Sequence, residues 1–382
     1  MLPEGWEVST VGRALSIQNE LRKPISAEIR EKNAGPYAYY GPTKAQGFIN
    51  TFEQDGRFCL IGEDGDHFLK FSTLPMTKII SGKCTVNNHA HILSNSSKCI
   101  IDWFFYYFMH RDISSHLTRQ GAGRYKLTKK ALEKLTILLP PLSEQKKIAA
   151  ILSTWDRAIE GTEKLLANSQ QQKKALMQQL LTGKKRLPGF TAEWPAIALR
   201  HALKEEKTPS VKNPQNIELL TVKLHHKGTI PSGKYPRLSE RGRTYHVRHS
   251  GTLIIGRQNL HNGGVAIVSD NCDGLIASNA ISSFSSHREY SVIFLYFLMC
   301  TNVFMCKIDT LTGGTGQKEV SNKDLLSIKW RIPPLPEQKA IAAVLTTADE
   351  EITALESDLT RLRQEKKALM QQLLTGKIRV AV

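Results

Sequence analysis

The residues of this chain that could carry out chemistry do not complete a catalytic motif. The nearest match to an Asn-Pro-Pro-Tyr methyltransferase loop is NPQN at 213–216, which lacks the second proline and the aromatic residue. A phosphate-binding loop needs an upstream glycine and a hydroxyl residue after Gly-Lys. GKK at 183–185 has neither, and GGTGQK at 313–318 has no serine or threonine after its lysine. The sequence therefore predicts no catalytic residue and no cofactor.

Two histidines could bind a metal ion. His89 and His91 fall on one face of a predicted strand, and imidazole is a common zinc ligand. No third ligand is evident nearby, so we predict no metal site and favour an ordinary polar strand face or one that faces DNA. Asp64 and Asp66 in GEDGD are typical of a turn rather than of a nuclease site.

An internal duplication provides the elements that must position any functional side chain. KKALMQQLLTGK occurs at 173–184 and again at 366–377, and PPLSEQKKIAAILSTWD from Pro140 corresponds to PPLPEQKAIAAVLTTAD from Pro333. All of these matches share an offset of 193 residues without a gap. Self-similarity at a fixed period is the signature of a repeated structural unit.

Each copy has the period of a coiled coil. Its predicted seam positions alternate in steps of four and three residues, and a Thr-Gly pair ends the pattern. In the first copy these positions are Ile148, Leu152, Trp155, Ile159, Thr162, Leu166, Ser169, Lys173, Leu176 and Leu180. In the second they are Ile341, Leu345, Ala348, Ile352, Leu355, Leu359, Leu362, Lys366, Leu369 and Leu373. A helix that presents such a seam needs a partner, so we expect the two copies to pack against each other.

The segments between the copies repeat the same plan with less agreement. GWEVSTVGRALS from Gly5 corresponds to EWPAIALRHALK from Glu193, and GAGRYKLTKKALEKL from Gly121 corresponds to GTGQKEVSNKDLLSI from Gly314. The predicted order is a first head (1–138), a helix (139–187), a second head (188–331) and a helix (332–382). We expect an α+β protein: two mixed globular heads joined by two long helices in an antiparallel coiled coil, with an internal pseudo-twofold repeat.

The charge distribution favours a polyanionic partner. The formal net charge is +17, of which the first head, the first helix and the second head contribute +5, +5 and +7, and the second helix none. None of the six cysteines forms a CxxC pair, which is typical of reduced thiols in a cytoplasmic protein. The start of the chain does not resemble a signal peptide, and the most apolar runs are too short to span a bilayer, so no membrane association is expected.

The repeated motifs resemble one known family. The two PPL-EQK-IAA segments, each ending in QQLLTGK, resemble the central and C-terminal conserved regions of specificity subunits of type I restriction–modification enzymes. The resemblance covers the whole chain and is most specific in the repeated helices. It implies that the heads are target recognition domains, each reading one half of a split site in double-stranded DNA. It also implies that the helices set the spacer and dock two modification subunits, that a restriction subunit joins the complex, and that this subunit carries no chemistry.

Candidate DNA contacts are long cations, which neutralise phosphates or read guanine, and polar or aromatic groups on loops. In the first head they are Tyr40, Lys44, Arg119, Arg124 and Lys126. In the second head they are Lys234, Arg237, Arg241, Arg243, Arg248, Arg257 and Gln258. The stretch from Lys234 to Arg248 is the strongest candidate, although a solvated loop would have a similar composition.

Candidate docking residues are polar side chains that both copies keep. They are Glu144, Gln145, Gln178 and Gln179 in the first helix and Glu337, Gln338, Gln371 and Gln372 in the second. Recent duplication would also explain their identity. The alternatives that stay open are the specificity subunit of a type II-like system and a self-sufficient DNA methyltransferase or nuclease.

Overall fold

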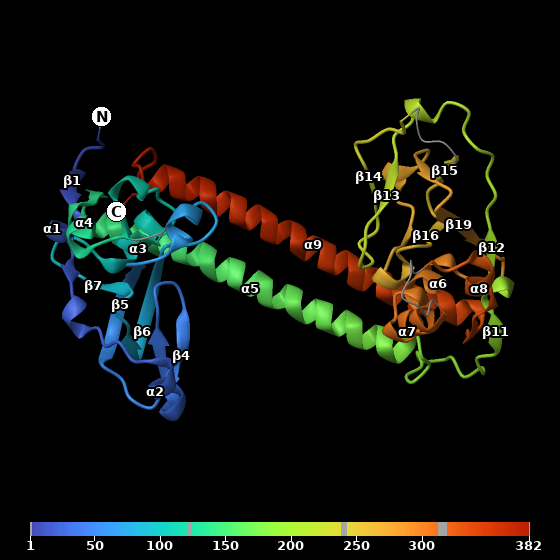
Figure 1. The fold of residues 1–382 in the computed structure, drawn as a ribbon, viewed down its shortest axis with the longest axis horizontal. Helices are drawn as coiled ribbons and strands as arrows, with labels where there is room; N and C mark the ends of the chain where they lie inside the picture. The colour runs from blue at the N-terminus through green and yellow to red at the C-terminus, as the bar shows by residue number, and fades with distance from the viewer. Residues whose placement is uncertain (1, 121–123, 238–242, 312–318, 382) are drawn as a thin grey trace. The chain divides into compact units, whose positions relative to one another are not determined.

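The computed structural model describes residues 2–120, 124–237, 243–311 and 319–381. Arg241, one of the predicted DNA contacts, therefore lies outside the described part of the chain. The chain divides into two compact units, 1–163 with 357–382 and 164–356, so the division cuts both long helices. These helices are α5 (Leu142–Leu180) and α9 (Leu335–Leu373) (Figure 1). Each unit thus contains one head and part of each long helix.

The first head is built on a six-stranded sheet with strand order β2-β7-β5-β6-β3-β4. Only β3 and β6 pair in parallel among these neighbours. The sheet strands are β2 (Ser16–Ile17), β3 (Ala34–Tyr40), β4 (Ala45–Ile49), β5 (Gln54–Gly62), β6 (Thr77–Val86) and β7 (Ala90–Ser94). The other strands are β1 (Glu7–Thr10), β8 (Thr118–Gln120), β9 (Arg124–Lys126) and β10 (Thr136–Leu139). The helices are α1 (Val11–Ala14), α2 (Ala27–Lys32), α3 (Ile101–Met109) and α4 (Lys129–Lys134), with 3₁₀ turns η1 (Asn19–Leu21), η2 (Asp66–Lys70) and η3 (Ser114–His116).

The second head has a smaller, four-stranded sheet with strand order β12-β19-β16-β17. Its strands are β12 (Leu203–Glu205), β16 (Leu253–Gly256), β17 (Val265–Ile267) and β19 (Ile281–Ser286). Three further pairs are β11 (Ala196–Ala198) with β20 (Lys329–Arg331), β13 (Leu220–Val222) with β14 (Thr229–Pro231), and β15 (Tyr245–Val247) with β18 (Ile276–Ser278). The helices are α6 (Val292–Met299), α7 (Asn302–Leu311) and α8 (Asn322–Ser327), with 3₁₀ turns η4 (Leu199–His201), η5 (Pro214–Asn216), η6 (Leu260–Asn262) and η7 (Asp270–Cys272).

The long helices pack in antiparallel fashion within each unit. In the first unit Arg363 donates to Glu163 at 2.6 Å, and in the second Ser169 donates to Glu351 at 2.9 Å. All twenty predicted seam positions are buried or half-buried, whereas most of their neighbours are exposed. The predicted 3.5-residue period is therefore confirmed.

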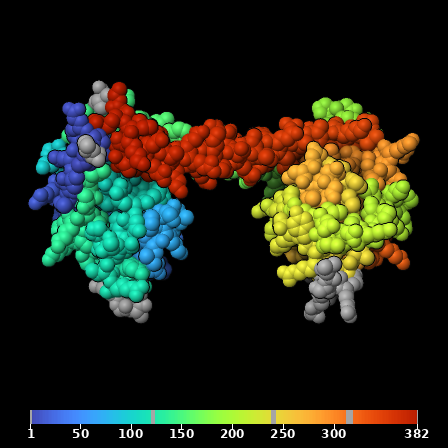
Figure 2. All heavy atoms as spheres, turned by 90° about the horizontal axis from the view of Figure 1, so that it is seen from above, coloured from blue at the N-terminus to red at the C-terminus, as the bar shows by residue number. Residues whose placement is uncertain are grey.

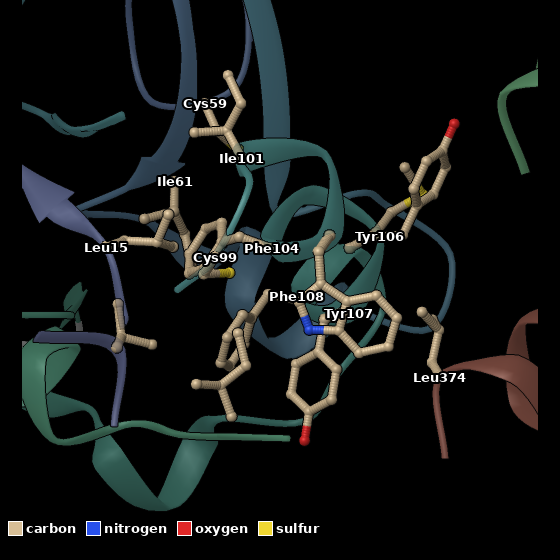
Figure 3. Packing of buried hydrophobic residues seen from close by; sticks show 14 of the residues in the cluster. Leu15, Cys59, Ile61, Cys99, Ile101, Phe104, Tyr106, Tyr107, Phe108 and Leu374 are labelled. Carbon is tan, nitrogen blue, oxygen red and sulfur yellow. The ribbon is translucent and has the colours of Figure 1, made fainter. Parts of the chain in front are cut away.

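The ends of the long helices complete the core of each head. In the first unit, Ile148, Leu152 and Leu373 join the cluster formed around Trp103 and Phe104 of α3. Figure 3 shows part of this cluster, in which Leu374, directly after α9, lies beside α3. In the second unit, Leu180, Ile341 and Leu345 join the cluster around Phe294 of α6. Burying one large apolar side chain contributes about 1.5–3 kcal/mol, so the helix ends add to the stability of each head.

The joints between head and helix repeat as the sequence predicts. The strand before each long helix pairs antiparallel with the first strand of its head, β1 with β10 and β11 with β20. The short helix that precedes this strand begins at equivalent caps, Thr128 accepting from Ala131 N at 3.2 Å and Ser321 from Asp324 N at 3.1 Å. Serine and threonine at this position satisfy a backbone N–H that has no partner within the helix. Among the described residues no single helix is long and apolar enough to cross a membrane, and only the bent pair α6 and α7 passes that test jointly.

Candidate nucleic-acid interface

The strongest candidate stretch surrounds a pocket in the second head. Lys234, Tyr235, Arg237 and Arg243 line a hollow of about 310 Å³ between β13, the segment after β14, and β18. Lys234, Arg237 and Arg243 are exposed, and Tyr235 is 55% exposed. The segment is held in place because the Lys234 carbonyl accepts from Leu219 N at 2.8 Å. The structure thus brings three of the predicted cations to one concave surface.

Arg248 belongs to the same stretch but has an internal position. Its side chain is 3% exposed, and Nη2 donates to the Ile281 carbonyl at 2.6 Å. Burial lowers the pKa of the guanidinium to about 10. An arginine buried in this way cannot reach a phosphate or a base, so the structure gives Arg248 a role inside the fold instead of the predicted contact.

Arg257 and Gln258, the other predicted contacts of the second head, differ in accessibility. Arg257 forms an ion pair with Glu319 at 3.0 Å and is only half-exposed, so part of its charge is already compensated. Gln258, the next residue, is exposed. Of this pair, Gln258 is the side chain that remains accessible to a ligand.

The candidates of the first head lie at the end of β3, in the turn to β4 and on the β8–β9 hairpin. Tyr40 ends β3, and Lys44 lies in the exposed turn to β4. Pro42 of this turn lies close to Gly62 at the end of β5, since a Cβ on Gly62 would come within 3.3 Å of it. The β8–β9 hairpin borders the same segment, because Asp64 bridges to Lys126. Arg119 and Arg124 on this hairpin are exposed, and Arg119 donates to the Tyr125 hydroxyl at 2.9 Å.

Lys126 is tied into a network of charges that the sequence did not reveal. Its Nζ lies 3.2 Å from Glu63 Oε1 and 3.9 Å from Asp64, and Glu63 also pairs with Arg22 at 2.5 Å. Lys126 therefore fixes the hairpin to the sheet and offers less free charge than Arg119 and Arg124. Its partners in this network lie far away in the sequence, and no local spacing indicated them.

The two histidines do not form a metal site. His89 pairs with Asp64 at 2.8 Å, whereas His91 is fully buried, with Asn19 Nδ2 2.8 Å from its Nδ1 and the Leu127 carbonyl 2.7 Å from its Nε2. Burial lowers the pKa of His91, which favours the neutral ring in this position. Among the residues that the structure describes, no group of three or more His, Cys, Asp or Glu side chains is placed to hold a metal ion.

Four of the predicted docking residues are buried at the joints. Glu144 and Glu337 are each 1% exposed, and Gln145 and Gln338 are 0% exposed. Gln145 accepts from Ile100 N at 3.1 Å, and Gln338 accepts from Ser291 N at 2.8 Å, so each glutamine ties a long helix to the start of α3 or α6. These side chains have no accessible surface for a partner, which corrects the expectation for all four.

The buried glutamates have partners that sequence reasoning missed. Glu144 accepts from Trp6 Nε1 at 3.1 Å and from Arg379 at 2.7 and 2.8 Å. Its equivalent in the second unit, Glu337, accepts from Trp194 at 3.0 Å and from Arg186 at 2.6 and 2.7 Å. The two arginines differ by the repeat offset of 193 residues, and this spacing was the available signal.

The remaining docking candidates are accessible. Gln178 and Gln179 near the end of α5, and Gln371 and Gln372 near the end of α9, are exposed. Figure 2 shows the last turns of α9 (red) at the surface of the first unit. These four glutamines therefore stay candidates for a partner surface that the chain presents twice.

Comparisons with known proteins agree with the repeated architecture. The profile of the type I restriction modification DNA specificity domain matches residues 3–168 and 212–362. The MjaVIII specificity subunit of Methanocaldococcus jannaschii, a type I restriction enzyme subunit, is 26% identical over 99% of this chain and 94% of its own length. The EcoDI specificity subunit of Escherichia coli is 22% identical over 99% of this chain and 89% of its own length.

A solved structure shares the fold. The crystal structure of a type I restriction–modification S subunit from M. genitalium superposes with a TM-score of 0.66 at 15% identity, covering 98% of this chain and 97% of the other. The profile matches span most of the chain and fall in both halves. This chain is therefore a member of the type I restriction modification DNA specificity family.

Proposed function

We propose that this chain is the noncatalytic DNA-specificity subunit of a type I restriction–modification complex, in which each head reads one half of a bipartite duplex target. The observation that carries the proposal is the contrast between joints and heads. The Trp–Glu–Arg joint occurs in both units with the same contacts, whereas one head has a six-stranded sheet and the other a four-stranded sheet. Equivalent joints in the two units hold two different heads. This arrangement suits a protein in which each head recognises a different DNA sequence.

The exposed cations support DNA as the ligand of both heads. Arg119 and Arg124 in the first head, and Lys234, Arg237 and Arg243 in the second, are accessible side chains on hairpins and loops. Such groups position a duplex through its phosphates and can reach base edges in the major groove. In this proposal the ligand is cytoplasmic double-stranded DNA, and no step of chemistry is assigned to this chain.

The long helices have two tasks in the proposed complex. Their packed seam sets the spacer between the half-sites, and the exposed glutamines near both helix ends dock two modification subunits. A restriction subunit completes the assembly. The identical sequence KKALMQQLLTGK in both helices supports the docking role, because one partner surface used twice must keep the same side chains.

The experiment that tests the proposal is methylation mapping. The chain is co-produced with the modification subunit of its own system, and the methylated bases of the host DNA are mapped at single-base resolution. The expected result is a split motif with adenine methylation in each half, which disappears when this chain is omitted. Methylation at a continuous site, or methylation that does not depend on this chain, contradicts the proposal.

A further inference from the structure

Two lysines occupy seam positions that a coiled coil normally fills with apolar residues. Lys173 in α5 and Lys366 in α9 stand at the same place in the two copies, and Lys366 is only 9% exposed. Each forms an ion pair across the seam, Lys366 with Asp156 in the first unit and Lys173 with Asp349 in the second. Desolvating charges in this way adds little stability, but a polar seam residue can specify which register two helices adopt.

In the first unit, a tyrosine of the head contacts both members of the Lys366–Asp156 ion pair. Tyr106 of α3 donates its hydroxyl to Asp156 Oδ2 at 2.7 Å, and Lys366 Nζ lies 5.5 Å from the centroid of its ring. Figure 3 shows Tyr106 projecting from α3 away from Leu15 and Ile61. Burial, reinforced by the hydrogen bond to Asp156, raises the pKa of Tyr106, so its hydroxyl remains a donor at neutral pH. We call Asp156, Lys366 and Tyr106 the first junction, since it joins α5, α9 and the head.

The second unit repeats this arrangement with one difference. Lys173 Nζ lies 5.5 Å from the centroid of the Phe297 ring on α6 and pairs with Asp349. Phenylalanine has no hydroxyl, so it cannot donate to Asp349 as Tyr106 donates to Asp156. Asp349, Lys173 and Phe297 form the second junction, which again joins α5, α9 and a head helix.

The junctions favour one register over its nearest alternatives. Apolar seams can slip by one heptad, because the pattern repeats every seven residues. In antiparallel helices, residue numbers rise along one helix as they fall along the other. A slip of seven residues in either direction would therefore replace Lys366 by Leu359 or Leu373 opposite Asp156. The same slip would place Leu166 or Leu180 opposite Asp349. Both carboxylates would then lose their cation, and neither junction could keep its lysine and its carboxylate together at the aromatic ring of the head.

We propose that the two junctions fix the register of α5 against α9 and the seat of each head on them, and thereby select a single spacer length in the DNA target. Asp156, Lys366, Asp349 and Lys173 are positioning residues, which touch no DNA. A slip of one heptad moves one helix along the other by about 10 Å, which corresponds to roughly three base pairs. This inference rests on the proposed function.

The test replaces the cations by apolar residues of similar length. Lys173→Met and Lys366→Met are combined, and the full chain with its modification subunits is incubated with a pool of duplexes carrying random sequence. Bound duplexes are sequenced, and the half-sites and the spacer lengths are counted separately. Lys173→Arg with Lys366→Arg keeps the cations as a rescue. Arg363→Met is the matched control, because Arg363 also pairs across the helices, with Glu163, but its side chain is 57% exposed.

The expected result is that the Met variant keeps both half-sites and binds several-fold more duplexes with neighbouring spacers, whereas the Arg variant and the control keep one spacer. Circular dichroism verifies that the helices form. If the double variant does not fold, Lys366→Met alone is measured, since it leaves the second junction intact. A folded variant with an unchanged single spacer overturns this inference. A wild-type complex that selects no split site contradicts the proposed function itself.

Discussion

Single buried side chains decide how each head is held. Glu144 is a buried carboxylate that accepts two hydrogen bonds from the Arg379 guanidinium and one from the Trp6 indole. A bidentate arginine–carboxylate pair fixes orientation as well as distance. By contrast, Lys234, Arg237 and Arg243 are exposed around a pocket. The side chains that fix the heads on the helices are therefore different residues from the cations that remain accessible to a ligand.

Replacing one of these accessible cations should affect only one half-site. We expect Arg237→Ala to weaken DNA binding by about 1–3 kcal/mol if the guanidinium reads a base, because a bidentate contact contributes that much discrimination. Any change in base preference should be confined to the half-site read by the second head, as measured by sequencing selected duplexes. Lys227→Ala, an exposed lysine on the turn between β13 and β14, is the control. Loss of preference in both half-sites would contradict independent heads.

The buried histidine of the first head should make stability depend on pH. Burial lowers the pKa of His91 in the folded chain below its ordinary value of 6.5. The unfolded chain then binds the proton first, so the stability contributed by His91 is complete above pH 6.5 and is lost as the pH falls toward the folded pKa. We expect the unfolding temperature to drop between pH 7 and pH 5, and less steeply in His91→Gln. Equal slopes for both proteins would exclude His91 as the cause.

At the scale of elements, the long helices combine two kinds of contact. Their seam positions are buried or half-buried along both copies, and their ends enter the cores around α3 and α6. Gln145 and Gln338 add hydrogen bonds to the first residues of these head helices. A helix whose ends are fixed in this way transmits a change in its length to the heads rather than absorbing it in a loop.

Lengthening both helices should therefore change the spacer. We expect insertion of seven helix-forming residues after Gly161 in α5 and after Thr360 in α9 to preserve the seam pattern. The insertion lengthens the pair by about 10 Å, or roughly three base pairs of duplex. Both half-sites should remain unchanged when bound duplexes are sequenced. Insertion in α5 alone mismatches the seam and serves as the destabilised comparison. An unchanged spacer in the matched double insertion would refute a measuring role for the helices.

At the scale of the whole molecule, charge is distributed unevenly along the chain. The net charge of +17 comes from both heads and the first helix, while the second helix is neutral. Cations that contact phosphates release counterions from DNA, so affinity falls as salt rises. Charge that lies elsewhere on the surface contributes much less to this slope, because it is screened beyond about 10 Å at 0.1 M salt.

The salt dependence of binding can therefore locate the DNA-facing charge. We expect combined alanine substitutions of Lys234, Arg237 and Arg243 to reduce the slope of log K against log salt by about 3, since each lost phosphate contact removes about 0.9. The matched control substitutes Lys129, Lys130 and Lys134, three exposed lysines of α4, and removes the same charge. Binding measured from 50 to 200 mM salt provides both slopes. Equal reductions would show that net charge rather than this pocket governs binding.

The sequence by itself determined the elements and their repetition. The heptad positions and the offset of 193 residues follow from patterns in the sequence, and the structure agrees with both. The heptad positions can be read from one chain because the helix period depends on residues within a few positions of one another. The division into two divergent heads was also visible, although not the difference between a six-stranded and a four-stranded sheet.

Only the tertiary structure decided which polar residues are accessible. Glu144 and Gln178 are both polar residues kept in the two copies, yet one is buried against Trp6 and Arg379 and the other is exposed. Arg248 and Arg237 differ in the same way within one basic stretch. The partners that bury a charge lie far from it along the chain, 235 residues away for Arg379 and Glu144. Burial of a charged group depends on such distant partners, and no local spacing encodes them.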